Sequence, residues 1–121
     1  MIEHGQIATT NRTYTSNDIA AYANQADVEV ASLSQVPEPL LAAQISYLLG
    51  VKLPGNGTMY LKQEMSFPNH APLDQEITTT VKITELRPDK GLVDLWASCE
   101  LEDGTVVCEG RSLVMNKICW D

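Results

Sequence analysis

One short segment constrains the fold of this chain more than any other. Residues 40–49 read Leu-Leu-Ala-Ala-Gln-Ile-Ser-Tyr-Leu-Leu, and a helix with this sequence is apolar on nearly every face. Pro37 and Pro39 come just before the run, where proline suits a helix's first turn, and Gly50 follows it as a candidate helix stop. A helix this apolar needs a cover, which the rest of the chain must supply.

The residues after this helix predict β-strands. Residues 58–67 alternate in polarity, and the two predicted faces carry Met59, Leu61, Met65 and Phe67 on one side and Lys62, Glu64 and Ser66 on the other. Residues 77–84 are rich in β-branched side chains, residues 87–91 read as a turn, and residues 93–101 alternate again. The second half of the chain is therefore predicted to be antiparallel β structure.

The last two strands are predicted to form a tight hairpin. Asp103 and Gly104 form a two-residue turn signal, and the final strand continues through Val114. This register places Cys99 opposite Cys108 on the inward side of the sheet. A disulfide and two small buried thiols are both compatible with that placement. With Cys119 the cysteines number three and lack the spacing of zinc ligands, so no metal site is predicted.

The N-terminal residues complete the predicted fold. The threonine-rich residues 5–15 favour an opening strand, and a short helix follows, ending near Gln25 and capped by Ser16 or Thr15. The sequence thus predicts one α+β domain spanning residues 1–121, with an antiparallel sheet of about five strands curled around one central apolar helix. This is the hot-dog arrangement. It leaves an edge strand exposed, so we expect a homodimer.

Charge and hydropathy limit the partners. The 121 residues include 16 acidic and 8 basic side chains, which give a net charge of -8. Nucleic acid is therefore an unsuitable partner, and a phosphate-bearing substrate would need cations gathered locally. The sequence shows neither a signal peptide nor an apolar run of the roughly 20 residues that a membrane span requires. We expect a cytoplasmic protein with no membrane contact.

Several motifs resemble a known family. Residues 45–67 are similar to a helix end, a Leu-Pro-Gly-x-Gly-Thr/Ser-x-Tyr-Leu turn and the strand after it, as found in the MaoC-like hot-dog dehydratases. Residues 72–77 and 15–23 resemble that family's Gly-Asp-Glu-Ile strand start and its first helix. The family includes the (R)-specific enoyl-CoA hydratases. The resemblance implies a lyase of fatty acid metabolism that acts on acyl or enoyl thioesters of coenzyme A or acyl carrier protein, without a further cofactor.

The resemblance also suggests a catalytic base. The family carries Asp-x-Asn-Pro-x-His after its first helix, and the Asp and His activate the water that adds across the double bond. Asp27 matches that Asp, whereas Glu29, Val30 and Ser32 replace the Asn, Pro and His. Because the loss of a general base typically costs a factor of roughly 10²–10⁴ in rate, the sequence predicts weak or altered hydration.

Glu38 allows three readings. The family usually has Gly here, at the helix start whose backbone N–H polarises the thioester carbonyl, and a carboxylate opposes the negative charge that develops there. Glu38 could instead activate water, as an acidic residue on this helix does in related hot-dog thioesterases. A glutamate in a first helical turn is also favoured by the helix dipole alone. The alternatives to a hydratase are thus a thioesterase using Glu38 and a non-catalytic subunit that binds an acyl group or supports a partner.

Three further residues are assigned to substrate binding: Leu40, Gln44 and Tyr60. Gln44 is a polar side chain within an apolar helix, so its amide must be hydrogen-bonded, either at an acyl tunnel or to strand carbonyls. His70 lies between prolines, where it is either an exposed loop residue or an acid or base for a partner's cleft.

Overall fold

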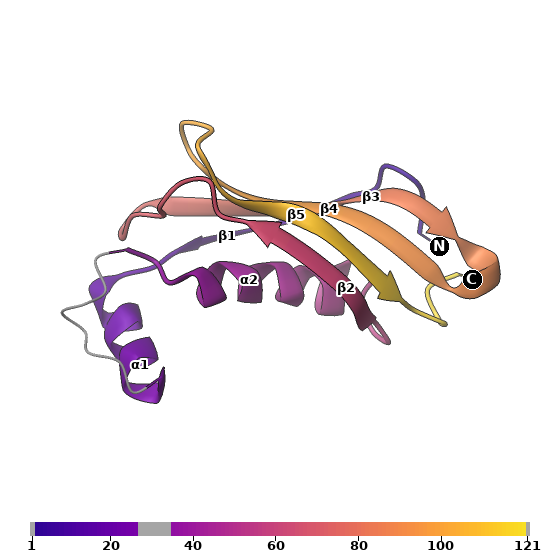
Figure 1. The fold of residues 1–121 in the computed structure, drawn as a ribbon, viewed down its shortest axis with the longest axis horizontal. Helices are drawn as coiled ribbons and strands as arrows, with labels where there is room; N and C mark the ends of the chain where they lie inside the picture. The colour runs from indigo at the N-terminus through magenta and orange to yellow at the C-terminus, as the bar shows by residue number, and fades with distance from the viewer. Residues whose placement is uncertain (1, 27–34, 121) are drawn as a thin grey trace.

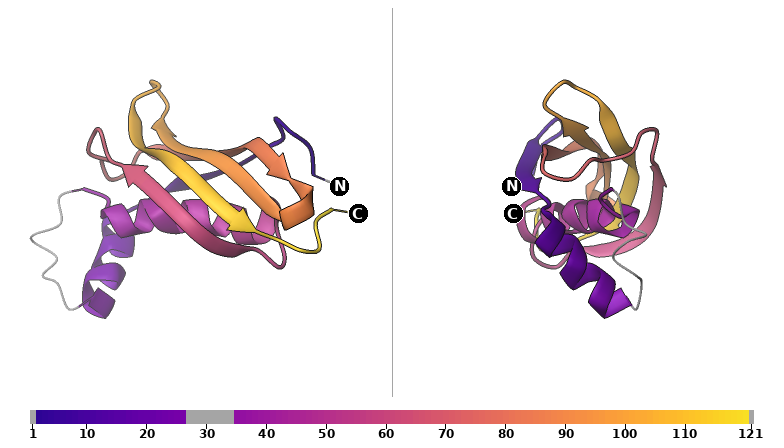
Figure 2. Two further views of the ribbon diagram at one scale, coloured as in Figure 1. Left: turned by 45° about the vertical axis from the view of Figure 1, so that its right-hand side comes forward. Right: turned by 90° about the vertical axis from the view of Figure 1, so that its left-hand side faces the viewer.

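The computed structural model describes residues 2–26 and 35–120, which form one antiparallel sheet and two main helices. In chain order the elements are β1 Ile7–Thr13, α1 Ser16–Ala26, α2 Glu38–Tyr47, η2 Leu48–Lys52, β2 Met59–Ser66, β3 Glu76–Arg87, η3 Pro88–Lys90, β4 Leu92–Leu101 and β5 Val106–Met115. The strand order is β1-β3-β4-β5-β2, so β1 and β2 are the edges. Figure 1 shows α2 along one face of the sheet, and Figure 2 shows the sheet curling around it. The predicted hot-dog fold is confirmed.

The core lies between α2 and the concave face of the sheet. Leu41, Ile45 and Leu48 are almost fully buried on the helix side. They belong to one cluster with alternate residues of the central strands, namely Ile77, Val81, Ile83, Val93, Leu95 and Ala97. Burying each large aliphatic side chain is worth about 1.5–3 kcal/mol, so this layer fixes α2 on the sheet.

The central helix does not stop at Gly50 as predicted. It runs on without a break from Tyr47 into the π-helical turn η2, and the Leu53 N–H donates to the Leu48 carbonyl at 2.8 Å. Leu48 and Leu49 are fully buried, and this packing holds the added turn against the sheet. The chain reverses at Gly55 instead, where φ is +94° and glycine is favoured.

Helix α1 begins with a reciprocal cap that decides between the two predicted capping residues. The Thr15 N–H donates to the Asp18 carboxylate at 2.9 Å, and the Asp18 N–H donates to Thr15 Oγ1 at 3.3 Å. Thr15 is therefore the cap, and Ser16 is the first helical residue.

Among the described residues, no helix is both long enough and apolar enough to cross a membrane.

One predicted strand face is wrong. A β-bulge at Leu61 interrupts the pairing of β2 with β5, between Tyr60 and Lys62. Met59 pairs with Met115 and Met65 with Gly110, which lie on opposite faces of β5. The predicted alternation placed both methionines on one face, and the extra residue in the bulge reverses that relation.

The β4–β5 hairpin differs from the predicted two-residue turn. The Leu101 N–H donates to the Thr105 carbonyl at 2.9 Å, so Glu102, Asp103 and Gly104 form a three-residue loop. A bulge at Val107 then shifts the pairing by one residue and restores Cys99 opposite Cys108. The cysteine register is therefore confirmed, although it depends on a bulge that the sequence analysis did not include.

Candidate functional site

Gln44 lies at the centre of a buried hydrogen-bond network beneath α2. Its Nε2 donates to Tyr14 Oη at 2.9 Å, and its Oε1 accepts a 2.6 Å hydrogen bond from Thr79 Oγ1. Tyr14 Oη in turn donates to the Leu40 carbonyl at 3.3 Å. We call Gln44, Tyr14 and Thr79 the inner network. It connects the end of β1, the first turns of α2 and the middle of β3 through side chains rather than strand carbonyls.

A groove runs beside the inner network, between β1 and α2. One hollow of about 240 Å³ is lined by Thr10, Asn11, Arg12, Tyr14, Ala43, Gln44 and Tyr47. A second hollow of about 280 Å³ shares Arg12, Tyr14 and Ala43 with it and extends past Leu40 to Asp18, Ala21, Tyr22 and Gln25 of α1. We call the two hollows together the α2 groove. Its walls combine aromatic rings and aliphatic side chains with several polar and charged groups, so it could hold a ligand that has both apolar and polar parts.

Arg12 supplies positive charge to the α2 groove. Its guanidinium carbon lies 4.6 Å from the centre of the Tyr14 ring, a cation–π distance. The Asp18 carboxylate is 3.9 Å away, so this ion pair is loose. Hydrogen bonds from Thr15, with a smaller contribution from Arg12, hold the pKa of Asp18 below its usual value.

The first turn of α2 offers few backbone donors. Pro39 has no N–H, and the Leu40 N–H donates to the Pro37 carbonyl at 3.0 Å. Glu38 is the first residue of the helix, and its N–H has no hydrogen-bond partner among the described residues. Its side chain is exposed. One backbone N–H and one carboxylate are thus the polar groups that Glu38 presents at this helix start.

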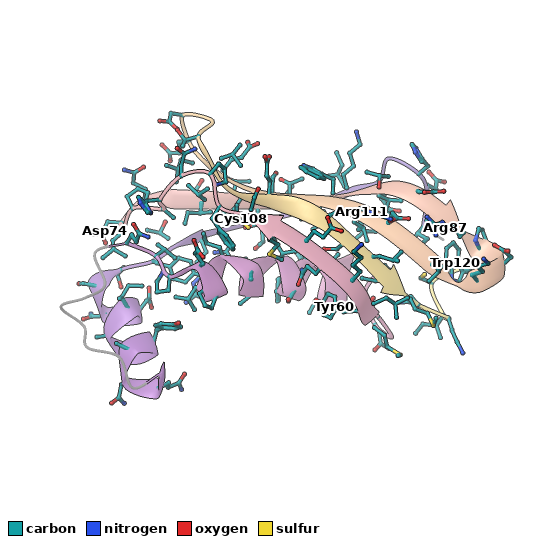
Figure 3. The ribbon with its side chains drawn as sticks, in the orientation of Figure 1. Tyr60, Asp74, Arg87, Cys108, Arg111 and Trp120 are labelled. Atoms are coloured by element: carbon teal, nitrogen blue, oxygen red, sulfur yellow. The ribbon has the colours of Figure 1, made fainter. Side chains whose placement is uncertain are left out.

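Three sulfur-bearing side chains gather between α2 and the sheet, where Figure 3 labels Cys108. Cys99 and Cys108 are free thiols, so the structure contains two buried side chains rather than a disulfide. Thr79 Oγ1 lies 3.3 Å from Cys99 Sγ, and Cys108 Sγ donates to Met65 Sδ at 4.0 Å. The hydrogen bond with Cys99 and burial raise the pKa of the Cys108 thiol, which makes it a poor nucleophile.

The structure brings together two of the five residues assigned to a site from sequence. Leu40 and Gln44 both line the α2 groove. Tyr60 lies apart on β2, where its Oη donates to the Ser46 carbonyl at 3.1 Å (Figure 3). Glu38 stands at the start of the same helix, and Asp27 lies outside the described residues. His70 is exposed in the segment that follows β2.

Sequence reasoning missed Tyr14, Arg12 and Thr79. The sequence did contain a signal for Tyr14. Tyr14 directly precedes the Thr15 cap and Ile19 lies four residues after it, which is the spacing of a hydrophobic staple. Both side chains are buried in the structure. Arg12 and Thr79 carry no such signal, since their roles depend on how closely β1, β3 and α2 approach one another. In the described part of the chain, no group of three His, Cys, Asp or Glu side chains is placed to hold a metal.

Comparison with known proteins reveals similarity along almost the whole chain. No family model matches the sequence. The chain is 30% identical to the (R)-specific enoyl-CoA hydratase of Aeromonas caviae over 93% of this chain and 94% of that protein. It is 31% identical to the (R)-specific enoyl-CoA hydratase of Rhodospirillum rubrum, over 94% and 88%. The solved (R)-hydratase of A. caviae involved in PHA biosynthesis superposes with a TM-score of 0.84 at 29% identity, covering 95% of this chain and 97% of that one.

Proposed function

Because the chain belongs to the MaoC-like hot-dog family of (R)-specific enoyl-CoA hydratases, we propose that it binds acyl or enoyl thioesters of coenzyme A or an acyl carrier protein. The reaction would add water to a 2-enoyl thioester and give a 3-hydroxyacyl thioester, or run in reverse. The observation that carries this proposal is the similarity to two (R)-specific enoyl-CoA hydratases over nearly their full length. The α2 groove supports it, since it offers a hollow with apolar and polar walls that begins beside the first turn of the helix.

The chemistry would occur at the start of α2. The Glu38 N–H is a donor for the thioester carbonyl, because the helix dipole adds positive potential there. That hydrogen bond would withdraw electron density from the double bond and favour attack at C3. The Glu38 carboxylate opposes the charge that develops on the carbonyl oxygen, which lowers the benefit.

Asp27 is the proposed base. It would take a proton from water while the water oxygen bonds to C3, and the same carboxyl group would return a proton to C2. In the family this work is shared with a histidine, whose position holds Ser32 in this chain. With one carboxyl group doing both tasks, we expect hydration to be slower by a factor of roughly 10²–10⁴ than with both groups present.

Two other functions are each favoured by a specific residue. Glu38 is exposed at the helix start and could activate water against a thioester, releasing a free thiol. The replacement of the family histidine by Ser32 favours a protein that binds the thioester without turning it over. These outcomes differ in product, so one experiment separates them.

A homodimer is part of the proposal. Strand β2 is a sheet edge, and Met59, Tyr60 and Leu61 at its start are between 45% and 60% exposed. Pairing this edge with a second copy would continue the sheet and bury these side chains. Light scattering at a gel-filtration peak is expected to give twice the chain mass. A Leu61→Lys variant should shift the mass toward that of the monomer, and a monomeric parent protein would refute this part.

The test of function is product mass spectrometry on a series of 2-enoyl-CoA and acyl-CoA thioesters of increasing chain length. We expect enoyl-CoA to gain the mass of one water, and free coenzyme A to stay at its blank level. Release of free coenzyme A would replace the hydratase proposal with the Glu38 thioesterase. If the protein is folded and every thioester stays unchanged, the result would favour a protein that binds the thioester without turning it over.

The role of Asp27 has its own test. Asp27→Asn should abolish hydration without lowering the thermal unfolding midpoint, since the amide cannot accept the proton from water. Glu29→Gln removes the same charge two residues later and serves as the matched control. Retained hydration in Asp27→Asn would refute the assignment.

A further inference from the structure

Cys99 and Cys108 face each other across two neighbouring strands, and neither takes part in the proposed hydration. They are directly paired in the ladder between β4 and β5, and both side chains are fully buried. Residues directly opposite in an antiparallel pair have Cα atoms about 4.5–5.5 Å apart, and a disulfide needs roughly 4.4–6.8 Å. The backbone therefore already has the spacing of a disulfide, although both thiols are free.

The two thiols differ in how readily they ionise. Hydrogen bonds with Cys108 and Thr79 lower the pKa of the Cys99 thiol in spite of its burial. The hydrogen bond with Cys99 and burial raise the pKa of Cys108. Because the thiolate is the nucleophile, Cys99 is the first of the pair to react. Oxidation of Cys99 to an uncharged sulfenic acid removes the charge that disfavours ionisation of Cys108, so Cys108 can react second.

One half-buried side chain separates the pair from solvent. Cys108 Sγ donates to Met65 Sδ at 4.0 Å, and Met65 is only partly buried. Met65 belongs to β2, which is an edge strand of the sheet. An edge strand opens at lower cost than a central one, since only one of its sides is held by a ladder. A small oxidant therefore reaches the thiols from the β2 side.

We propose that Cys99 and Cys108 are a reversible dithiol–disulfide pair that a hydroperoxide oxidises, and that the new bond alters the inner network. Cys99 attacks one peroxide oxygen, the O–O bond breaks, and Cys99 becomes a sulfenic acid as the first water leaves. Cys108 then attacks the Cys99 sulfur, the S–O bond breaks, and a second water leaves as the disulfide forms. The two thiols thus lose two electrons, which reduce one hydrogen peroxide to two waters. This inference does not depend on the proposed function.

The connection to the inner network runs through Thr79. Thr79 Oγ1 gives its hydrogen to Gln44 Oε1 and lies 3.3 Å from Cys99 Sγ, so the Cys99 thiol is the donor in the second contact. A disulfide has no S–H to donate. Thr79 Oγ1 then loses a hydrogen bond, and its own hydrogen bond to Gln44 changes with it. Oxidation of the pair is therefore felt at Gln44, in the wall of the α2 groove.

Peptide mapping after oxidation tests the inference without any substitution. The folded protein is treated with hydrogen peroxide, then unfolded and alkylated without a reductant. Trypsin releases residues 91–111 as one peptide, because no Lys or Arg lies between Lys90 and Arg111. We expect this peptide to have lost the mass of two hydrogen atoms and to carry no alkyl group, while Cys119 is still alkylated. Dithiothreitol added before alkylation should restore both adducts.

Matched variants assign the bond. Cys99→Ala should leave Cys108 open to alkylation after peroxide treatment, whereas Cys119→Ala should form the same bridge as the parent protein. Alkylation of both cysteines in the parent peptide would overturn the inference, as would a disulfide that includes Cys119. A bridge that forms only when the protein is first unfolded in urea, or oxygen gained at Met65 with both thiols intact, would also overturn it.

The effect on the inner network has a separate readout. In the isotope-labelled protein, the side-chain amide resonances of Gln44 should shift on oxidation and return on reduction. Those of Gln6, an exposed glutamine near the N-terminus, serve as the control and should not move. A disulfide that forms without any shift at Gln44 would refute the connection to the inner network.

Discussion

Each face of the sheet holds a buried polar cluster, and the two clusters differ in charge and in what they connect. Beneath α2, the inner network joins Gln44 to Tyr14 and Thr79 by hydrogen bonds between neutral groups. On the opposite face, the Asp94 side chain is only 3% exposed and binds Arg87 and Arg111, which Figure 3 labels. We call these three residues the outer cluster. Its arginines stay partly exposed, so water reaches one side of each ion pair.

Because the two clusters connect different elements, they should affect different properties of the protein. The outer cluster connects β3, β4 and β5, strands that backbone hydrogen bonds already hold in register. The inner network connects α2 to the end of β1 and to β3. These two strands share a backbone ladder, but no ladder joins the helix to either of them. Changes in the outer cluster should therefore alter stability alone, whereas changes in the inner network should also move the wall of the α2 groove.

The largest stability effect is expected from Asp94→Ala. It leaves two arginines without their shared carboxylate, and we expect the free energy of unfolding to fall by about 2–3 kcal/mol, as for hydrogen bonds to charged groups. Urea denaturation measures this, and Glu85→Ala is the control, since that exposed partner of Arg87 should cost under about 0.5 kcal/mol. The affinity of the folded variant for butyryl-CoA should be unchanged. If Asp94→Ala weakened butyryl-CoA binding as much as an inner-network variant does, the proposed difference between the two clusters would be refuted.

A smaller stability effect with a larger functional effect is expected from Gln44→Leu. Tyr14 Oη keeps the Leu40 carbonyl and Thr79 Oγ1 keeps Cys99 Sγ, so the cost should be only about 1 kcal/mol. The variant loses a polar group of the groove and the hydrogen bond that holds Tyr14, so we expect butyryl-CoA to bind about tenfold more weakly. Gln63→Leu makes the same change at an exposed position of β2, where it removes only a long 3.4 Å hydrogen bond to Ser112 Oγ, and its affinity should match that of the parent protein. Unchanged affinity in Gln44→Leu would contradict the role of the inner network.

A double-mutant cycle sharpens the comparison further. Gln44→Leu combined with Thr79→Val should show a coupling energy of about 1 kcal/mol, because the two side chains share a hydrogen bond. Gln44→Leu combined with Asp94→Ala should be additive within about 0.5 kcal/mol, since the two residues share no partner across the sheet. Unfolding by urea supplies all the required free energies. Strong coupling across the sheet would show that the clusters are not independent.

The smallest effect is expected at the α1 cap, which borders the groove but belongs to neither cluster. The pKa of Asp18 is lowered chiefly by the hydrogen bond from the Thr15 N–H. A carboxyl whose pKa is lower in the folded state stabilises the protein above its unfolded value, near 3.8, and loses that contribution as the pH falls through the folded value. Asp18→Asn should therefore lower the thermal midpoint slightly near neutral pH, and the difference from the parent should shrink below pH 3.8. A difference that grows on acidification would contradict this sign.

The sequence predicted the architecture because the strongest signals are periodic. The apolar run at residues 40–49 and the alternating strands gave the right elements in the right order. Its errors fall at Leu61, Val107 and Gly50, where a bulge or an added helical turn is decided by packing against neighbouring elements. Alternation in one strand does not reveal an extra residue, because that residue is defined only by its partner strand.

The candidate site was predictable only in part. Gln44 stood out because a polar side chain in an apolar helix needs a partner, and the structure supplies two. Its partners come from residues 30 and 35 positions away, a separation that no local pattern encodes. In the sequence, Arg12 is indistinguishable from an ordinary exposed residue of a threonine-rich strand. Its place in the α2 groove is seen only once the structure sets β1 beside α2.

The most direct test of this account is a titration of the isotope-labelled protein with butyryl-CoA, a saturated thioester that cannot be hydrated, followed by amide chemical shifts. We predict that the largest changes fall on residues 10–14 and 40–47, which border the α2 groove. Changes centred on Trp96 and Arg111 of the opposite sheet face would contradict the account, as would an unchanged spectrum at saturating ligand.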